Sequence, residues 1–263
     1  MTDYQFITRE QRGHVAIVRL NRAEACNALN FEIMSEIEHV ALAFRDDQQT
    51  RVVVFAGAGR HFSAGADLKE FGKHTEESIA ARRQRLRMGE RVMRAWLGVD
   101  QITVCAWNGG AIGGGGCLAL ATDFRIGAED CYLYYPEIDL GLNLMWQSLP
   151  RTVRMLGETR ALRLVIGGER ANADTLLGWD VLEKIVPVDR LIDSACEFAE
   201  IYASKSPIAA QMIKRSVNAI GGSLDQAIMH MDADQHIMVA STSDHSTAVD
   251  AYSNKRTGEF VGN

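Results

Sequence analysis

The chain has 263 residues, of which 47% are apolar and 24% are charged, and it contains only 4 prolines. This composition is typical of a folded globular protein and excludes the collagen-like, coiled-coil and disordered classes. With 28 basic and 34 acidic residues the net charge is −6, so no general electrostatic attraction brings nucleic acid or an anionic membrane to the protein. We therefore expect neither of them as a partner.

Cysteine and histidine usage argues against disulfides and metal sites. The five cysteines are odd in number, widely spaced and without a Cys-x-x-Cys pair, which predicts reduced thiols and no thiolate metal site. The seven histidines show no metal-ligand spacing. No run of about 18 apolar residues occurs, and residues 1–10 lack the basic start and apolar stretch of a signal peptide. A cytoplasmic location is therefore expected.

The first part of the chain alternates strand and helix patterns. Short β-branched runs at residues 14–20 (HVAIVRL) and 51–57 (RVVVFAG) predict buried strands, and apolar residues recur at helical spacing between them, from Ile33 to Phe44. Residues 102–107 (ITVCAW) and 123–127 (DFRIG) predict two more strands. Helices that cross over between such strands imply parallel pairing with right-handed connections.

Past residue 150 the character changes. Strand patterns nearly vanish, apart from a short run at 184–188, and helical spacing dominates. The spacing from Leu224 to Met231 predicts a helix capped by Ser223, and Ser243 or Asp244 is expected to start another. We therefore predict a core domain at residues 1–200 and a C-terminal helical region at residues 201–263.

Two glycine-containing turns that follow predicted strands indicate ligand binding. The first is Ala64-Gly65-Ala66, whose small residues let backbone amides approach a ligand, although a plain strand-to-helix turn has the same pattern. The second has four consecutive glycines, Gly113 to Gly116, at the start of an apolar helix. Amides at a helix start carry the positive end of the helix dipole. An anionic group is therefore expected at this second turn.

Two kinds of anion are compatible with these turns. A dinucleotide is one, because Gly114, Gly116 and Ala119 fit G-x-G-x-x-A, with Asp130 or Glu137 as a ribose ligand. The turn is long for that motif, however. The better account is an oxyanion hole, since amides from two separate turns, each after a strand, can converge on one carbonyl oxygen.

Four sequence blocks carry a family resemblance. They are NRAEACNALN at 21–30, HFSAGADLKEF at 61–71, NGGAIGGGGCLALATDFRIG at 108–127 and YPEIDLGL at 135–142. In order and spacing they resemble the crotonase, or enoyl-CoA hydratase/isomerase, superfamily, and AYSNKRTGEF at 251–260 resembles its terminal helix. The resemblance covers essentially the whole chain. It implies an α/β fold, a crotonase-like spiral of ββα turns with a C-terminal helical region, and an acyl-CoA-converting enzyme.

The resemblance also implies roles for individual residues and for the assembly. The amides of Ala66 and Gly114 are expected to bind the oxygen of a coenzyme A thioester, which is the substrate, with no bound cofactor and no metal. The residues expected to contact the acyl-CoA are Ala64, Asp67, Leu68, Cys117 and Lys255. Of these, Asp67 is expected to be structural, and Lys255 or Arg256 to reach the 3′-phosphate of coenzyme A. The expected assembly is a homo-oligomer, either a trimer or a dimer of trimers, with subunit contacts from residue 206 onward. In this resemblance the region 201–263 serves oligomerisation and covers the active site.

Acid and base positions distinguish the reactions of the family. Its hydratases carry two glutamates, which align with Glu137 and with Cys117, 20 positions earlier. A thiol with a pKa of about 8.5 is a poor substitute for a carboxylate in holding and deprotonating water. A single carboxylate suffices for a proton shift, so the best prediction is double-bond isomerisation by Glu137. Met145 and Trp146 are expected to border the acyl pocket.

Several alternatives remain open from the sequence. The chain is alternatively a hydratase or lyase for an unusual enoyl-CoA whose acyl group supplies the missing polar group. Outside that class, two alternatives remain: a non-catalytic acyl-CoA binder, and an NAD-binding oxidoreductase, which the dinucleotide motif at Gly114 to Ala119 would indicate. Cys117 is either a small buried helix residue or an activated thiol at a helix start. Asp139 is expected, by strand alternation, to face away from Glu137.

Overall fold

The computed structural model describes residues 4–71 and 77–263, so residues 1–3 and 72–76 lie outside it. Within these ranges the main sheet has the strand order β1-β2-β3-β4-β6-β9. Its strands are β1 (Ile7–Arg12), β2 (Val15–Leu20), β3 (Val52–Gly57), β4 (Ile102–Trp107), β6 (Phe124–Ala128) and β9 (Lys184–Val186). A smaller sheet has the order β5-β7-β8. Its strands are β5 (Gly110–Ile112), β7 (Tyr132–Tyr134) and β8 (Ala171–Asn172).

Pairing in the main sheet is parallel from β2 to β9, as the sequence predicted. Strand β1 pairs antiparallel with β2 at the edge of the sheet and was not predicted. Its sequence, ITREQR, buries only Ile7 and has no apolar alternation. A strand of this kind gives no periodic signal, because backbone pairing rather than apolar burial places it.

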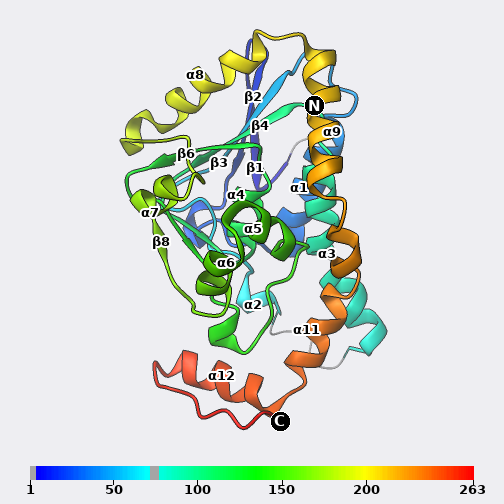
Figure 1. The fold of residues 1–263 in the computed structure, drawn as a ribbon, viewed down its shortest axis with the longest axis vertical. Coiled ribbons are helices and arrows are strands. Elements are labelled where there is room, and N and C mark those ends of the chain that lie inside the picture. Colours follow the sequence, from blue (N-terminus) through cyan, green and yellow to red (C-terminus); the bar gives the residue numbers. More distant parts are fainter. Residues whose placement is uncertain (1–3, 72–76) are drawn as a thin grey trace.

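Helices cover both faces of the main sheet, which explains why its strands read as continuous apolar runs. On one face, Val18 and Phe55 belong to a core that also includes residues of α1 (Phe31–Ala43), α3 (Ile79–Leu97) and α4 (Gly114–Leu120). On the other face, Ile17 and Val54 pack with α8 (Leu191–Ala203). Figure 1 shows α8 on one side of the strands and α1, α3 and α4 on the other. The sheet is thus a rigid centre from which the connecting turns project.

The predicted helix between the first two parallel strands is confirmed as α1. Asn30 caps it by accepting a hydrogen bond from Ile33 N at 2.9 Å. Its buried residues Ile33, Ile37 and Val40 follow the predicted spacing. The helix therefore lays one apolar face on the sheet.

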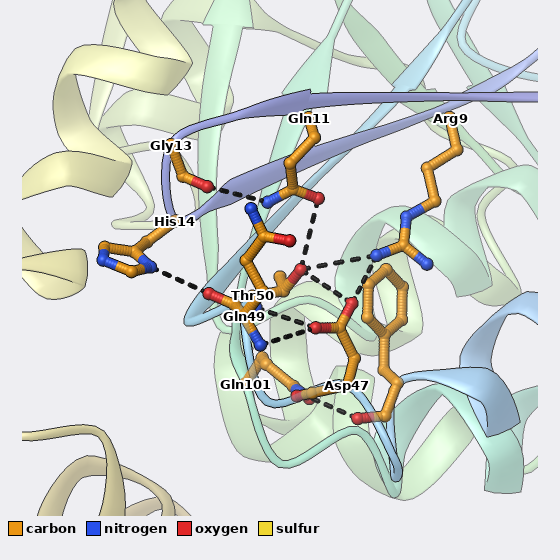
Figure 2. Close-up of polar contacts among 9 residues, drawn as sticks. Arg9, Gln11, Gly13, His14, Asp47, Gln49, Thr50 and Gln101 are labelled. Carbon is orange, nitrogen blue, oxygen red and sulfur yellow. Dashed lines mark hydrogen bonds and ion pairs between the residues drawn. The ribbon is translucent and has the colours of Figure 1, made fainter.

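A polar cluster fixes the loop that leads from α1 into β3 (Figure 2). The Asp47 carboxylate accepts hydrogen bonds from Gln49 N at 2.9 Å and Thr50 N at 2.8 Å, and it forms an ion pair with Arg9 of β1. Burial by itself raises the pKa of Asp47, but these bonds outweigh it and lower the pKa. The cluster ties the edge strand to the start of β3.

Short helices make up much of the remainder of the described chain. They are α2 (Leu68–Phe71), α5 (Leu149–Leu156), α6 (Glu158–Val165), α7 (Ala173–Gly178) and the one-turn segments η1 (Ala23–Ala25), η2 (Ile138–Leu140) and η3 (Val188–Arg190). The C-terminal region contains α9 (Pro207–Gly221), α10 (Asp225–Met229), α11 (Asp232–Ala240) and α12 (Ser243–Ser253). In the view of Figure 1, α9 lies on the opposite side of the strands from α8, and α11 and α12 continue to the lower end of the molecule.

The prediction for residues 223–231 was partly wrong. Helix α10 begins at Asp225 with Leu224 at the N-cap, so Ser223 does not cap it, and the helix ends at Met229. Its apolar residues Leu224 and Ile228 are exposed, so the predicted stripe does not belong to the core of the described residues. The start of α12 at Ser243 agrees with the prediction, although Thr242 provides the cap.

Lys214 joins the C-terminal region to the core. Its buried ammonium group donates to Gln101 O at 2.7 Å and lies 2.7 Å from the carboxylate of Asp123. The Asp123 carboxylate also accepts from Thr103 N of β4, at 2.8 Å. A buried charge requires such partners. Helix α9 is thereby attached to the main sheet where β4 and β6 begin.

Candidate active site

Hydrogen bonds between the two glycine-containing turns hold them side by side. Ser63 N donates to Gly110 O at 3.1 Å, and Ile112 N donates to Ser63 O at 2.9 Å, which makes a parallel bridge between Ser63 and Ala111. Gly65 has a φ of +80°, and a Cβ there would lie 2.5 Å from Ile112 O and 3.4 Å from Gly114 N. Only glycine allows this close approach. The first turn therefore lies directly against the start of α4.

Ala66 N–H and Gly114 N–H are both free of backbone partners. Leu29 bridges to Ala66 by donating to Gly65 O at 2.7 Å and accepting from Asp67 N at 3.1 Å, so the N–H of Ala66 itself faces away from that bridge. Gly114 is the first residue of α4 and has no intrahelical acceptor. In the described part of the chain neither amide donates a hydrogen bond. Two free donors on adjacent turns can hold a carbonyl oxygen that gains negative charge.

Glu137 lies against the second turn. It precedes the one-turn helix η2, and a Cβ on Gly113 would lie 2.7 Å from its Oε1. The Gly113 φ of +49° and this contact both require glycine at that position. Oε2 of Glu137 is buried without a hydrogen-bond partner among the described residues. A buried, unpartnered carboxyl beside a free amide is an arrangement suited to proton transfer.

Burial raises the pKa of Glu137 from its ordinary value of 4.5 to about 7. The cause is loss of solvation, because the apolar and backbone surroundings disfavour the charged form. Near neutral pH such a carboxyl has comparable populations of acid and base. It can therefore both accept and return a proton.

Cys117 is a buried thiol, only 2% exposed, on the first turn of α4. Its Sγ lies 4.0 Å from Met145 O. Burial, and then the charge of Glu137, raises the pKa of the Cys117 thiol well above its usual range. The thiol is therefore neutral, and the alternative of an activated helix-start nucleophile is wrong. The position that the resemblance aligns with the second glutamate of a hydratase therefore holds a neutral thiol and no carboxylate.

Trp146, which was expected only to border the acyl pocket, packs directly on Gly114. A Cβ on Gly114 would lie 2.7 Å from Cη2 of the indole, and a Cβ on Gly89 of α3 would lie 2.1 Å from Nε1. The indole thus fits between α3 and α4 at two glycines. Gly89 was a missed signal, since glycine inside a long helix costs about 1 kcal/mol relative to alanine and calls for a packing reason.

Asp232 was missed by sequence reasoning and lies next to the same loop. Its carboxylate is buried and accepts a hydrogen bond from Gln147 N at 3.1 Å. Burial raises the pKa of Asp232 to about 6, although bonds from the Gln147 and Trp146 amides oppose the rise. No local pattern could have identified this residue, because its partner lies 85 positions earlier in the chain.

The residues expected along the coenzyme A moiety are distributed differently. Ala64 lies in the first turn, and Leu68, at the first position of α2, is exposed. Asp67 accepts from Arg22 at 2.6 Å. Burial alone raises the pKa of Asp67, but the bond and charge of Arg22 lower it overall, which suits a structural carboxylate. Lys255 is exposed in the turn after α12, and within the described ranges its backbone N–H donates a hydrogen bond to Tyr252 O, at the end of that helix.

Asp139 accepts a hydrogen bond from the Tyr134 hydroxyl at 2.5 Å, but it lies in η2 rather than in a strand, so the alternation argument was wrong. For the dinucleotide alternative, β5 intervenes between β4 and α4, and Asp130 accepts from Gly109 N at 3.1 Å. The direct strand-to-helix turn of that motif is therefore not formed.

Across residues 4–71 and 77–263, His, Cys, Asp and Glu side chains form no group of three or more that could hold a metal ion. In the same ranges, no helix has the length and apolar character needed to cross a bilayer.

The raised pKa of Glu137 predicts a pH-dependent stability. Because the folded state binds this proton more tightly than the unfolded state, the stabilisation is complete below about pH 4.5 and is lost as the pH rises through about 7. Glu137→Gln should therefore raise the free energy of unfolding by up to about 3 kcal/mol at pH 8 and by little at pH 4.5. Denaturant unfolding at both pH values measures this, with Asp139→Asn as control. An equal effect at both pH values would contradict the assignment.

Comparison with known proteins agrees with the fold and the motif order. A sequence profile of the enoyl-CoA hydratase/isomerase family matches residues 10–263. The chain is 29% identical to a short-chain-enoyl-CoA hydratase of Clostridium acetobutylicum, over 97% of each protein, and 31% identical to a probable enoyl-CoA hydratase of Rhizobium meliloti, over 98% of each. The crystal structure of carnitinyl-CoA hydratase from Mycobacterium avium superposes with a TM-score of 0.87 at 27% identity, covering 99% of this chain and 100% of that one. The predicted resemblance is confirmed, and the chain belongs to the enoyl-CoA hydratase/isomerase family of the crotonase superfamily.

Proposed function

We propose that the chain isomerises the double bond of an enoyl-CoA thioester, with Glu137 as the only proton carrier. The observation that carries this proposal is the position of Glu137, a buried carboxyl with a pKa of about 7 against Gly113, beside the free amide of Gly114. The neutral thiol of Cys117 occupies the position where a hydratase of the family has a second glutamate. With one carboxylate, a proton shift is the reaction that needs no further group.

The proposed reaction is a proton shift along the acyl chain, assisted by the two free amides. The thioester oxygen accepts hydrogen bonds from Ala66 N–H and Gly114 N–H. Glu137 removes a proton from C2 of a 3-enoyl-CoA, and the electron pair of that C–H bond spreads over the carbon chain to the oxygen as a dienolate. The two amides stabilise this charge. Glu137 then returns the proton to C4, which leaves the double bond between C2 and C3.

Coenzyme A is proposed to lie along the first turn. Ala64, Asp67 and Leu68 border its adenine and pantetheine, with Asp67 holding the loop through Arg22. Cys117 contacts the acyl group, since it lies on the first turn of α4 after Gly114. Lys255 is exposed and is proposed to reach the 3′-phosphate from a neighbouring subunit.

Hydration is the second candidate function, and the names of the relatives favour it. They include a short-chain-enoyl-CoA hydratase, a crotonyl-CoA hydratase and a 2,3-dehydroadipyl-CoA hydratase, all 29% identical to this chain. Hydration by this chain requires that the acyl group itself supply the polar atom that Cys117 lacks. Substrates with oxygen on the acyl chain would then be preferred over simple enoyl-CoAs.

Loss of the Glu137 carboxylate should separate catalysis from binding. Glu137→Gln keeps the shape but cannot accept a proton, so kcat for 3-enoyl-CoA isomerisation should fall by about 100-fold or more with little change in coenzyme A affinity. Turnover and calorimetric binding measure the two effects, and Asp139→Asn is the matched control. Full activity in Glu137→Gln would reject Glu137 as the proton carrier. Tight acyl-CoA binding by the native protein with no exchange at C2 in heavy water would instead indicate a non-catalytic binder.

A second variant distinguishes isomerase from hydratase. Cys117→Glu restores the missing carboxylate, and hydration of a simple 2-enoyl-CoA should become measurable only in this variant. Cys117→Ser, which adds a hydroxyl without a carboxylate, is the control. Product mass and chirality identify the reaction, and thermal unfolding shows whether the buried glutamate is tolerated. Efficient hydration by the unaltered chain would overturn the isomerase proposal.

We also propose that residues 201–263 assemble the oligomer and cover the site. Helix α9 exposes a row of apolar side chains, which are Ile208, Met212, Ile213, Val217 and Ile220. A patch of this kind needs a partner surface. The same region also contacts the segment that carries Glu137. In α12, the Nδ1 atom of His245 forms a hydrogen bond with Leu140 O at 2.7 Å, three residues after Glu137.

The apolar row on α9 predicts the state of assembly. Sedimentation should give about three or six times the 29.0 kDa of one chain. Ile213→Glu places a charge within the row and should shift the protein towards monomers, whereas Leu162→Glu, at an exposed apolar position of α6, should not. A native monomer, or an Ile213→Glu variant that remains assembled, would contradict this assignment.

A further inference from the structure

Trp146 occupies space beside the proposed oxyanion hole. Its six-membered ring lies on Gly114, whose Cβ position would be within 2.8 Å of two ring carbons. An acyl group that accepts a hydrogen bond from Gly114 N–H places its carbonyl oxygen about 2.9 Å from that nitrogen. The first carbons of such an acyl group lie close to Gly114, the residue on which the indole packs.

Two glycines accommodate the indole, and they come from different helices. At Gly89 of α3 a Cβ would lie within 2.3 Å of three indole atoms, and at Gly114 of α4 it would lie within 3.1 Å of three others. Gly89 is buried inside a 19-residue helix, where glycine is unfavourable by about 1 kcal/mol relative to alanine. Space for the indole is the physical reason for glycine at this position.

The backbone that carries Trp146 is strained and held in place. Trp146 and Gln147 both have left-handed φ values, +65° and +56°, which cost side-chain-bearing residues about 1–2 kcal/mol each. The Asp232 carboxylate accepts from Gln147 N at 3.1 Å, and the Ser148 hydroxyl donates to Trp146 O at 3.2 Å. A strained turn fixed by a buried carboxylate from the C-terminal region points to a function for the indole position.

We propose that Trp146 closes the acyl end of the site and restricts the enzyme to short acyl groups. Asp232 is a positioning residue, because it acts through the backbone of the 146–147 turn. The inference rests on the proposed function, since it takes an acyl-CoA as the ligand. It goes beyond that function by assigning the substrate class, short-chain enoyl thioesters, to one side chain.

Binding of saturated thioesters tests the inference without requiring turnover. Calorimetric titrations with free coenzyme A, butyryl-CoA and octanoyl-CoA compare the native protein with Trp146→Ala. Each methylene that becomes buried strengthens binding about fourfold. The native protein should bind octanoyl-CoA no more tightly than butyryl-CoA, because the added methylenes find no space. In Trp146→Ala the affinity for octanoyl-CoA, relative to that for butyryl-CoA, should rise by at least about tenfold.

Controls separate the role of Trp146 from general effects on folding. Trp179→Ala removes an indole that packs against Arg160 and Arg163, away from the two glycine turns, and should leave the ratio of affinities unchanged. Trp146→Phe retains a smaller ring and the core contact, so it should give an intermediate ratio even if Trp146→Ala folds poorly. Asp232→Asn should raise the ratio of octanoyl-CoA affinity to butyryl-CoA affinity, as Trp146→Ala does.

The outcomes of the experiment are distinguishable. Equal ratios in the native protein, Trp146→Ala and Trp146→Phe would overturn the inference while leaving the proposed function intact. Tighter binding of octanoyl-CoA than of butyryl-CoA by the native protein would also overturn it. Absence of binding for all three coenzyme A compounds would reject the proposed function, and the inference with it.

Discussion

Hydrogen bonding between the Ser63 and Ala111 segments brings together two turns that lie nearly 50 residues apart in the chain. Each turn follows a strand, and each leaves one amide, that of Ala66 or Gly114, without an acceptor in the described structure. The main sheet fixes the ends of its strands, so these amides keep their places without a ligand. Donors positioned in advance stabilise developing charge without reorganising during the reaction.

Several features of the proposed site lower the stability of the folded protein. Burial of Glu137 raises its pKa to about 7, which disfavours the charged carboxylate of the folded protein above that pH. The left-handed residues Trp146 and Gln147 add backbone strain, and Asp232 is buried to hold them. Such unfavourable features are tolerated where the surrounding packing is extensive, as it is around the fully buried strands. Substitutions that relieve them are therefore expected to stabilise the fold at the expense of activity.

The C-terminal helices connect the chemistry to the proposed assembly. Asp232 of α11 bonds to the turn that carries Trp146, and His245 of α12 bonds to the segment that follows Glu137. Lys214 attaches α9 to the sheet by a buried ion pair with Asp123. The same region exposes the apolar row of α9. Contacts made by a neighbouring subunit on α9 would therefore be transmitted to both sides of the proposed acyl site.

The sequence by itself determined the elements whose burial follows a local period. The parallel strands β2, β3, β4 and β6 and the helix α1 were predicted because each has an apolar pattern that backbone geometry imposes on any chain burying one or both faces. The glycine turns and Glu137 were located by motif order. Strand β1 was missed, since it pairs at the edge of the sheet through its backbone and buries only Ile7, which leaves no apolar alternation in its sequence.

Only the tertiary structure decided which distant groups meet. The fit of Trp146 between Gly89 and Gly114, the bond from Gln147 N to Asp232, and the pKa of Glu137 all depend on how separate elements pack. Local periodicity specifies which side of an element is buried, but it does not specify the partner on the other side of the core. Desolvation and close packing are properties of that partner, and they set the chemistry of this site.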